Sequence, residues 1–164
     1  DVDVSPLSSK NQFDTVMEYI GIGTEEGADL IYGGRSPSGG IFDEGYYVEP
    51  TIFAGVDQNM RIAQEEVFGP VLSILKWTEY DALIDAVNGV DYGLTASVWT
   101  RDLSQAMRAV DDICAGYVWV NNSSDHFLGT PYGGMKQSGI GREECLGEML
   151  SYTEQKNVNI TFDA

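Results

Sequence analysis

The chain has 164 residues, 43% of them hydrophobic, which is enough for one domain with its own core, and no apolar run is long enough to cross a bilayer. Nine Lys and Arg against 26 Asp and Glu give a formal net charge of −17, and a surface this acidic repels nucleic-acid phosphates and anionic lipids, so neither is an expected partner. The two cysteines, Cys114 and Cys145, form no pattern typical of a disulfide framework or a metal site, which favours a reducing, cytoplasmic location.

The first 53 residues predict one helix followed by two strands. A helix is expected over 9–26, because its apolar residues recur at the spacing of one helical face and its first residue forms a capping box with Gln12. A short strand over 28–32, a surface loop over 35–45 and a strand over 46–53 follow, and the proline inside the last one favours an edge position or a break.

The middle of the chain alternates strands and helices. Strands are predicted over 71–77, 94–100 and 117–121, with helices over 80–88 and 102–113 between them. Connections this short imply right-handed crossovers and a parallel sheet, so the predicted fold class is α/β. Ligands of such sheets bind at the carboxyl ends of the strands. The inward face of the second helix is predicted to consist of Leu103, Ala106, Met107, Val110 and Ile113.

The C-terminal part predicts a glycine-rich loop over 129–141, a short helix over 143–152 and a strand over 153–162. A terminal strand needs an edge to pair with, and another subunit is one way to supply it.

Glycine pairs and cysteines at first suggest functional sites. Gly21 and Gly23 have the wrong spacing for a dinucleotide fingerprint and lie late in a predicted helix. A turn is favoured over an anion site at Gly139, although backbone amides before a helix can hold an anion. Cys114 is predicted to be packed and inert, and the acids around Cys145 oppose its ionisation, so neither is expected to be a nucleophile.

The segment from Glu65 to Pro70, with the sequence EEVFGP, is the strongest candidate site. A carboxylate fixed at Glu66 could accept both hydrogen bonds from a vicinal diol such as a ribose, and the ring of Phe68 could support a flat heterocycle. The alternative is a pair of solvated acids before a strand. His126, the only histidine, is interpreted first as part of the loop structure and second as a substrate contact.

These segments resemble the aldehyde dehydrogenase superfamily. The resemblance covers nearly the whole chain as ordered blocks, of which EEVFGP and PYGGMKQSGIGRE are the most specific. The blocks are Pro6–Ser8 with Gln12–Phe13, Glu26–Ala28 with Gly33–Gly34, Gly45–Thr51, Glu65–Pro70, Asp91–Leu94, Gly116–Asn121 and Pro131–Glu143.

The resemblance implies the oxidation of an aldehyde to a carboxylic acid with NAD or NADP. In this chemistry a cysteine thiolate attacks the aldehyde, hydride passes to the nicotinamide, and a water activated by a glutamate releases the acid. It also implies that Glu66 holds the nicotinamide ribose, that Phe68 lies beside the nicotinamide, and that Gln12 approaches the ribose. The family often has a lysine three residues after this glutamine, where this chain has Thr15, so the resemblance implies no lysine contact with the ribose here.

The substrate tunnel of the family is lined by the segment that here contains Asn122, His126 and Tyr132, so the resemblance implies that these three residues bind the aldehyde. It implies further that residues 1–152 are the C-terminal part of the catalytic domain and that 153–164 are the oligomerisation strand of a homodimer or homotetramer.

The family's catalytic cysteine, general-base glutamate and phosphate-binding glycines all belong to its upstream part. The chain has no initiator methionine, so we expect it to begin inside a longer protein and to be inactive alone. Two alternatives stay open at this point. One is a stand-alone, non-catalytic module that assembles or binds through its last strand. The other is a generic α/β domain that binds a small molecule.

Overall fold

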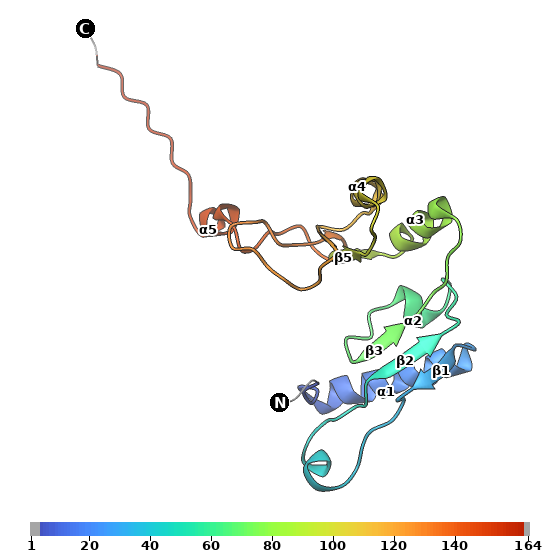
Figure 1. Cartoon of the computed structure of the whole chain (residues 1–164). Helices are drawn as coiled ribbons and strands as arrows, with labels where there is room; N and C mark the ends of the chain where they lie inside the picture. Colours follow the sequence, from blue (N-terminus) through green and yellow to red (C-terminus); the bar gives the residue numbers. More distant parts are fainter. Residues whose placement is uncertain (1–3, 163–164) are drawn as a thin grey trace. The chain divides into compact units, whose positions relative to one another are not determined.

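The computed structural model describes residues 4–162, which divide after residue 86 into two units, each with its own internal packing (Figure 1). Residues 1–3 and 163–164, at the ends of the two predicted segments 1–152 and 153–164, lie outside the described residues. The elements of the first unit are α1 (Lys10–Glu25), β1 (Asp29–Tyr32), the 3-10 helix η1 (Gly40–Glu44), β2 (Thr51–Ala54), α2 (Arg61–Gln64) and β3 (Val71–Ser73).

Helix α1 confirms the prediction for the N-terminal region. Ser9 is its N-cap, and the Ser9 hydroxyl accepts a hydrogen bond from the backbone N–H of Gln12 at 3.2 Å. The helix ends before Gly27, whose φ of 95° lies in the left-handed region that favours glycine. The reciprocal bond of the expected capping box is replaced, because the side chain of Gln12 donates to backbone carbonyls of residues 67 and 68 instead.

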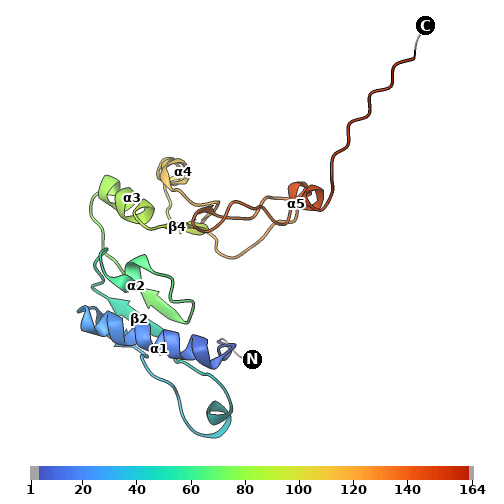
Figure 2. The same cartoon turned by 180° about the vertical axis from the view of Figure 1, so that it is seen from behind.

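The three strands of the first unit form one sheet in the order β1-β2-β3, with α1 lying alongside it in both views (Figures 1 and 2). β1 pairs antiparallel with β2, and β2 pairs parallel with β3. The core lies between α1 and the sheet, and burying these side chains is its main source of stability. Its buried residues are Val16, Ile20, Ala28, Val48, Phe53, Val56 and Ile62.

Pro50 divides the strand that the sequence predicts over 46–53, so β2 begins at Thr51. Thr51 is buried, with 1% of its surface exposed, and its hydroxyl both donates and accepts a hydrogen bond. The hydroxyl donates to the carbonyl of Glu49 at 2.8 Å and accepts from the N–H of Gly34 at 2.9 Å. These two bonds fix the turn after β1 against the start of β2.

Helix α3 (Tyr80–Asn88) has the predicted bounds and leads into the second unit. The other elements there are β4 (Tyr92–Gly93), β5 (Thr95–Val98), α4 (Leu103–Asp112), β6 (Tyr117–Val120), β7 (Met135–Lys136) and α5 (Leu146–Ser151). β5 and β6 are parallel neighbours joined through α4, which confirms the predicted crossover between them.

The predicted inward face of α4 is partly wrong. Ala106 and Ala109 are the buried residues of this helix, whereas Leu103 and Met107 are 75% and 54% exposed. The small alanine side chains allow close packing on β5. The larger residues at either side of this contact find no neighbours to cover them within residues 4–162.

The single parallel sheet expected from the strands over 71–121 is also corrected. β3 is the third strand of a mixed sheet that contains the antiparallel β1–β2 pair, β5 and β6 form a separate parallel pair, and β4 and β7 form an antiparallel pair. Apolar periodicity predicts where strands lie but carries no information on which edges pair, so these partners could not be assigned from the sequence.

The C-terminal region differs from its prediction in two ways. α5 begins at Leu146 instead of near Glu143, because Glu143 pairs with Tyr132 across an isolated bridge and Glu144 has a φ of 60°, which is incompatible with a helix. Residues 153–162 are exposed and form no strand within the described part of the chain, where they pair with none of its sheets.

Candidate functional site

The segment Glu65–Pro70 connects α2 to β3 and is pressed closely against α1. A Cβ atom added to Gly69 would lie 2.5 Å from a methyl carbon of Val16, so only glycine allows this approach. The carbonyl of Pro70 then accepts a hydrogen bond from the N–H of Thr51 at 2.8 Å, at the start of the β2–β3 pairing. The segment is therefore held by the core of the first unit.

The two adjacent acids of this segment have different surroundings. Glu65 is bound by the guanidinium of Arg61 at 2.8–3.1 Å and by the hydroxyl of Tyr19. The hydrogen bonds from Arg61, followed by the one from Tyr19, lower the pKa of Glu65 to about 2. The bond to Glu65 in turn raises the pKa of Arg61 and that of Tyr19. Glu66 is exposed, and its carboxylate has no hydrogen bond or ion pair within residues 4–162. Glu66 is therefore the acid whose oxygens are available to a ligand.

Phe68 presents its ring to solvent, with 74% of its surface exposed. Its φ is 51°, which is unusual for a bulky residue and turns the chain sharply. The side-chain amide of Gln12 donates to the carbonyl of Phe68 at 2.6 Å and to that of Val67 at 3.3 Å. Gln12 thus lies next to the predicted cofactor residues, with its amide nitrogen engaged by the backbone of the segment.

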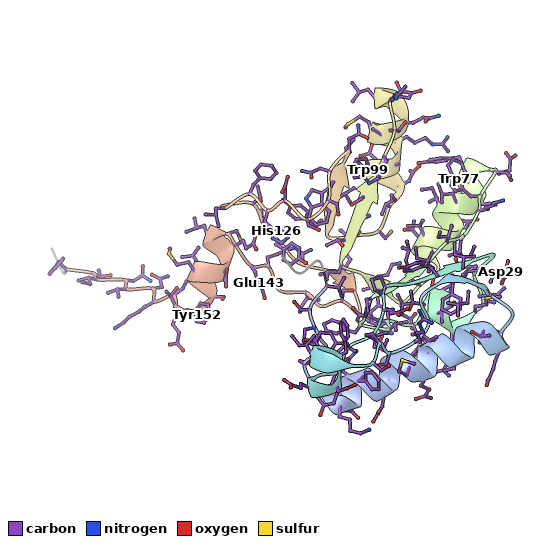
Figure 3. The ribbon with its side chains drawn as sticks, turned by 60° about the horizontal axis from the view of Figure 1, so that its bottom comes forward. Asp29, Trp77, Trp99, His126, Glu143 and Tyr152 are labelled. Atoms are coloured by element: carbon purple, nitrogen blue, oxygen red, sulfur yellow. The ribbon has the colours of Figure 1, made fainter. Side chains whose placement is uncertain are left out.

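In the second unit, His126 lies on the segment after β6 (Figure 3), and aromatic rings surround it. The centroid of the His126 ring lies 4.5 Å from that of Tyr132 and 5.8 Å from that of Tyr117, the latter nearly parallel at 19°. Nδ1 of His126 is 2.8 Å from a carboxylate oxygen of Glu144. The structure therefore brings two of the predicted substrate residues, His126 and Tyr132, together, and adds an acid that lies 18 positions away in the sequence.

Asn122 is not part of this ring cluster. Its amide donates to the carboxylate of Asp125 at 3.0 Å, and its oxygen accepts from the N–H of Ser123 at 2.7 Å, so it shapes a local turn. It does line a shallow hollow together with Tyr117, Trp119 and Phe127.

The glycine-rich blocks serve close packing of the backbone. A Cβ atom on Gly116 would clash with the carbonyl of Gly133, and Gly23 of α1 packs on Phe53. Gly139, with a φ of 101°, directly follows the turn at residues 137–138 and lies well before α5. Cys114 is exposed, so its predicted packing is wrong. Cys114 follows the end of α4, and the neighbouring Ala115 is buried in its place.

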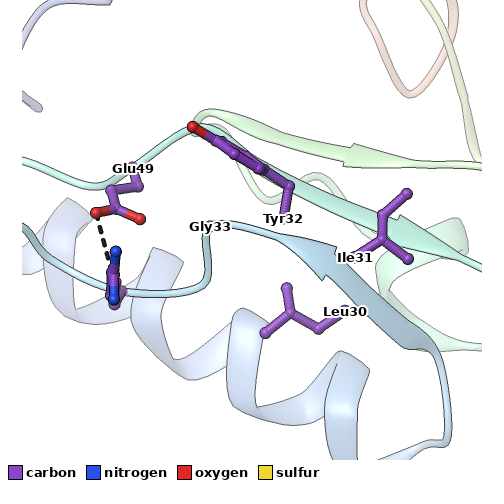
Figure 4. Close-up of a pocket in the computed structure, with 6 residues that line it drawn as sticks. Leu30, Ile31, Tyr32, Gly33 and Glu49 are labelled. Atoms are coloured by element: carbon purple, nitrogen blue, oxygen red, sulfur yellow. Dashed lines mark hydrogen bonds and ion pairs between the residues drawn. The ribbon is translucent and has the colours of Figure 1, made fainter.

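Another hollow of the first unit lies beside β1, away from the EEVFGP segment. It is lined by Leu30, Ile31, Tyr32 and Gly33 and by the Arg35–Glu49 ion pair, whose atoms are 3.0 Å apart (Figure 4). It is an open strand edge, with Ile31 57% exposed, and it has no group suited to covalent chemistry. Within residues 4–162, no cluster of His, Cys, Asp and Glu could hold a metal ion, and no helix has the length and apolarity of a membrane span.

Comparison with known proteins decides the family. The sequence model of the aldehyde dehydrogenase family matches residues 1–158. The chain belongs to the aldehyde dehydrogenase family. An aldehyde dehydrogenase of Talaromyces stipitatus, tropH, is 49% identical over 94% of this chain and 30% of its own length. A betaine aldehyde dehydrogenase of Mesorhizobium japonicum is 46% identical over 98% of this chain and 33% of its own length.

Solved aldehyde dehydrogenases have the same mixed α/β fold. The Mycobacterium tuberculosis aldehyde dehydrogenase, crystallised with NAD+, matches with a TM-score of 0.87 and 42% identity, over 93% of this chain and 31% of that one. The chain thus spans about a third of the length of the aldehyde dehydrogenases that it matches.

Proposed function

We propose that this chain is the C-terminal part of an NAD(P)-dependent aldehyde dehydrogenase that oxidises an aldehyde to a carboxylic acid. Residues 1–152 would complete the catalytic domain, and 153–164 would form the oligomerisation strand of a homodimer or homotetramer in the cytoplasm. The observation that carries the proposal is the pair Glu66 and Phe68, both exposed on a segment clamped against α1.

These residues fit a nicotinamide riboside. The carboxylate of Glu66 has unused acceptor oxygens for the two ribose hydroxyls, and the exposed ring of Phe68 offers a flat apolar surface two residues further on. Gln12 supports the site by holding the carbonyls of Val67 and Phe68, with its own amide oxygen left for the ribose. The bound cofactor supplies the acceptor for the hydride. NAD is the first candidate, because a relative of known structure was crystallised with it.

The ring cluster of the second unit supports a role in substrate binding. His126 and Tyr132 lie together beside a partly exposed aromatic wall, and Asn122 lines the adjoining hollow. Aromatic walls with few polar groups are typical of sites that bind small organic substrates.

Catalysis itself is assigned to residues outside this chain. Its cysteines are poor candidates for the attacking thiolate, because Cys114 lies at a helix end with no general base bonded to it and Cys145 is followed by Glu148. The nucleophile and the general base of the reaction would come from the two thirds of the relatives that the chain does not match.

The proposal is tested by comparing two polypeptides, this chain alone and the same chain joined to the upstream sequence of its own gene. We expect NADH formation from NAD and an aldehyde only with the longer protein. Activity of the chain alone would contradict the proposal. A gene whose coding sequence starts at Asp1 would favour the stand-alone module instead.

A further inference from the structure

His126 and Glu144 form a pair whose geometry fixes the state of the imidazole. Nδ1 of His126 lies 2.8 Å from Oε1 of Glu144, and both side chains are about two-thirds buried, with 34% and 29% exposed. An ionised carboxylate only accepts hydrogen bonds, so the neutral ring must carry its proton on Nδ1. Nε2 then bears a lone pair, and it has no hydrogen-bond partner in the described part of the chain.

The surrounding rings hold the imidazole in this orientation. Tyr132 packs on it at 4.5 Å between centroids, Tyr117 is stacked at 5.8 Å, and Trp119 lies at 5.9 Å. The indole N–H of Trp119 donates to the carbonyl of Asp125, the residue before His126, at 2.8 Å. The position of the ring is therefore determined from several sides, as a recognition group requires.

Glu144 is held in an unfavourable conformation to make this contact. Its φ is 60°, its backbone N–H donates to the carboxylate of Glu148 at 2.7 Å, and its carbonyl accepts from Gly129 at 2.9 Å. Its second carboxylate oxygen is buried without a partner within residues 4–162. Backbone strain and an unsatisfied oxygen together are not explained by packing, and such features concentrate at functional sites.

We propose that His126 determines substrate specificity by accepting, at Nε2, a hydrogen bond from a hydroxyl or N–H group of the aldehyde, and that Glu144 is the residue that positions it. This proposal rests on the proposed function, which makes His126 part of the substrate wall. The substrate class is therefore an aldehyde that carries a hydrogen-bond donor on its body. A site built to pair with a donor discriminates strongly against the analogue that lacks it, because its polar group is then left unpaired.

The tautomer is measured on the chain itself, since His126 is its only histidine and gives a single set of imidazole nitrogen signals. At alkaline pH we expect the proton on Nδ1 in the unmodified chain and in Glu143→Ala, the matched control that removes the neighbouring exposed acid. Glu144→Ala is expected to shift the ring to the Nε2–H form that free imidazole side chains prefer. An Nε2–H ring in the unmodified chain, or a tautomer that Glu144→Ala leaves unchanged, overturns the positioning role.

The substrate class is measured on the full-length enzyme with benzaldehyde and the three monohydroxybenzaldehydes. We expect kcat/KM to favour at least one hydroxylated aldehyde over benzaldehyde, and His126→Phe to lower this ratio about tenfold. Glu144→Ala should lower the preference in the same direction. A preference that His126→Phe leaves unchanged overturns this inference alone. Absence of NADH formation with every aldehyde overturns the proposed function and, with it, the inference.

Discussion

At the scale of single residues, neighbouring acids of this chain have different surroundings. Glu65 and Glu66 are neighbours with the same side chain, yet Glu65 is bonded by Arg61 and Tyr19 whereas Glu66 has no partner within residues 4–162. The first acid therefore contributes to folding and the second is available for recognition. A similar distinction holds for Glu143, which is exposed, and Glu144, which turns toward His126.

The role of Glu65 predicts a specific loss of stability in acid. Its pKa falls from 4.5 to about 2 in the folded chain, chiefly through the hydrogen bonds from Arg61. A depressed carboxyl pKa adds stability above the unfolded value and loses it as the pH falls through the folded one. The melting temperature of Glu65→Gln should therefore fall less than that of the unmodified chain between pH 4.5 and about 2. Glu66→Gln is the control, and parallel curves for Glu65→Gln and the unmodified chain would contradict the prediction.

The strain at Glu144 predicts that glycine is better tolerated there than alanine. Both substitutions remove the carboxylate, but only glycine adopts a φ of 60° without steric conflict. Glu144→Gly should therefore be more stable than Glu144→Ala by about 1 kcal/mol in urea unfolding. Equal stability of the two variants would show that the backbone at this position is not strained.

At the scale of elements, local signals in the sequence were sufficient for α1, α3 and α4, whereas α2 was not predicted and α5 begins later than expected. The bounds of these three helices follow from apolar spacing and, for α1, from the Ser9 cap, which acts within three residues. The structure adds an Asp102 cap at the start of α4. The β1–β2 and β4–β7 pairs were missed because pairing depends on contacts that are distant in the sequence.

The same limit applies to the candidate site. The exposure of Glu66 and Phe68 agrees with the prediction that they meet a ligand, although the ligand itself stays a prediction. The bond from Gln12 to the Phe68 carbonyl and the bond between His126 and Glu144 join residues 56 and 18 positions apart. No periodic pattern connects such residues, so only the folded chain reveals these contacts.

The contact between α1 and the EEVFGP segment gives a prediction with a built-in control. Gly69→Ala would place a methyl group 2.5 Å from Val16, and relieving this conflict should destabilise the chain by about 1–3 kcal/mol. Gly21 lies on α1, the helix that contains Val16, and a Cβ atom added there meets no atom within 4 Å. Gly21→Ala should therefore stabilise the chain by about 0.5–1 kcal/mol. Chemical unfolding measures both. A neutral Gly69→Ala would show that the segment is not pressed against α1.

At the scale of the whole molecule, exposed apolar side chains agree with a chain that spans about a third of its relatives. Large hydrophobic residues are exposed on β1, on α4 and along the C-terminal residues, where Val158, Ile160 and Phe162 are 63%, 70% and 85% exposed. Surfaces of this kind are typical of interfaces. We infer that the remaining part of the proposed enzyme and a second subunit cover them.

The net charge of −17 predicts a salt response. Repulsion among the acids opposes the folded state. Added salt screens this repulsion, because the Debye length falls to about 3 Å at 1 M and is then shorter than the distance between most of the acids. The melting temperature should therefore rise by several degrees between low and molar sodium chloride. A flat response would mean that the acids are too well spread to repel one another.

The most direct test of the central claim is an NAD titration of the full-length enzyme with the two neighbouring acids changed in turn. Glu66→Gln should raise the dissociation constant of NAD about tenfold, because it removes the charged acceptor proposed for the ribose hydroxyls. Glu65→Gln, which breaks the contacts with Arg61 and Tyr19, should leave NAD affinity unchanged. An unchanged affinity for Glu66→Gln would contradict the assignment of this segment to the nicotinamide ribose.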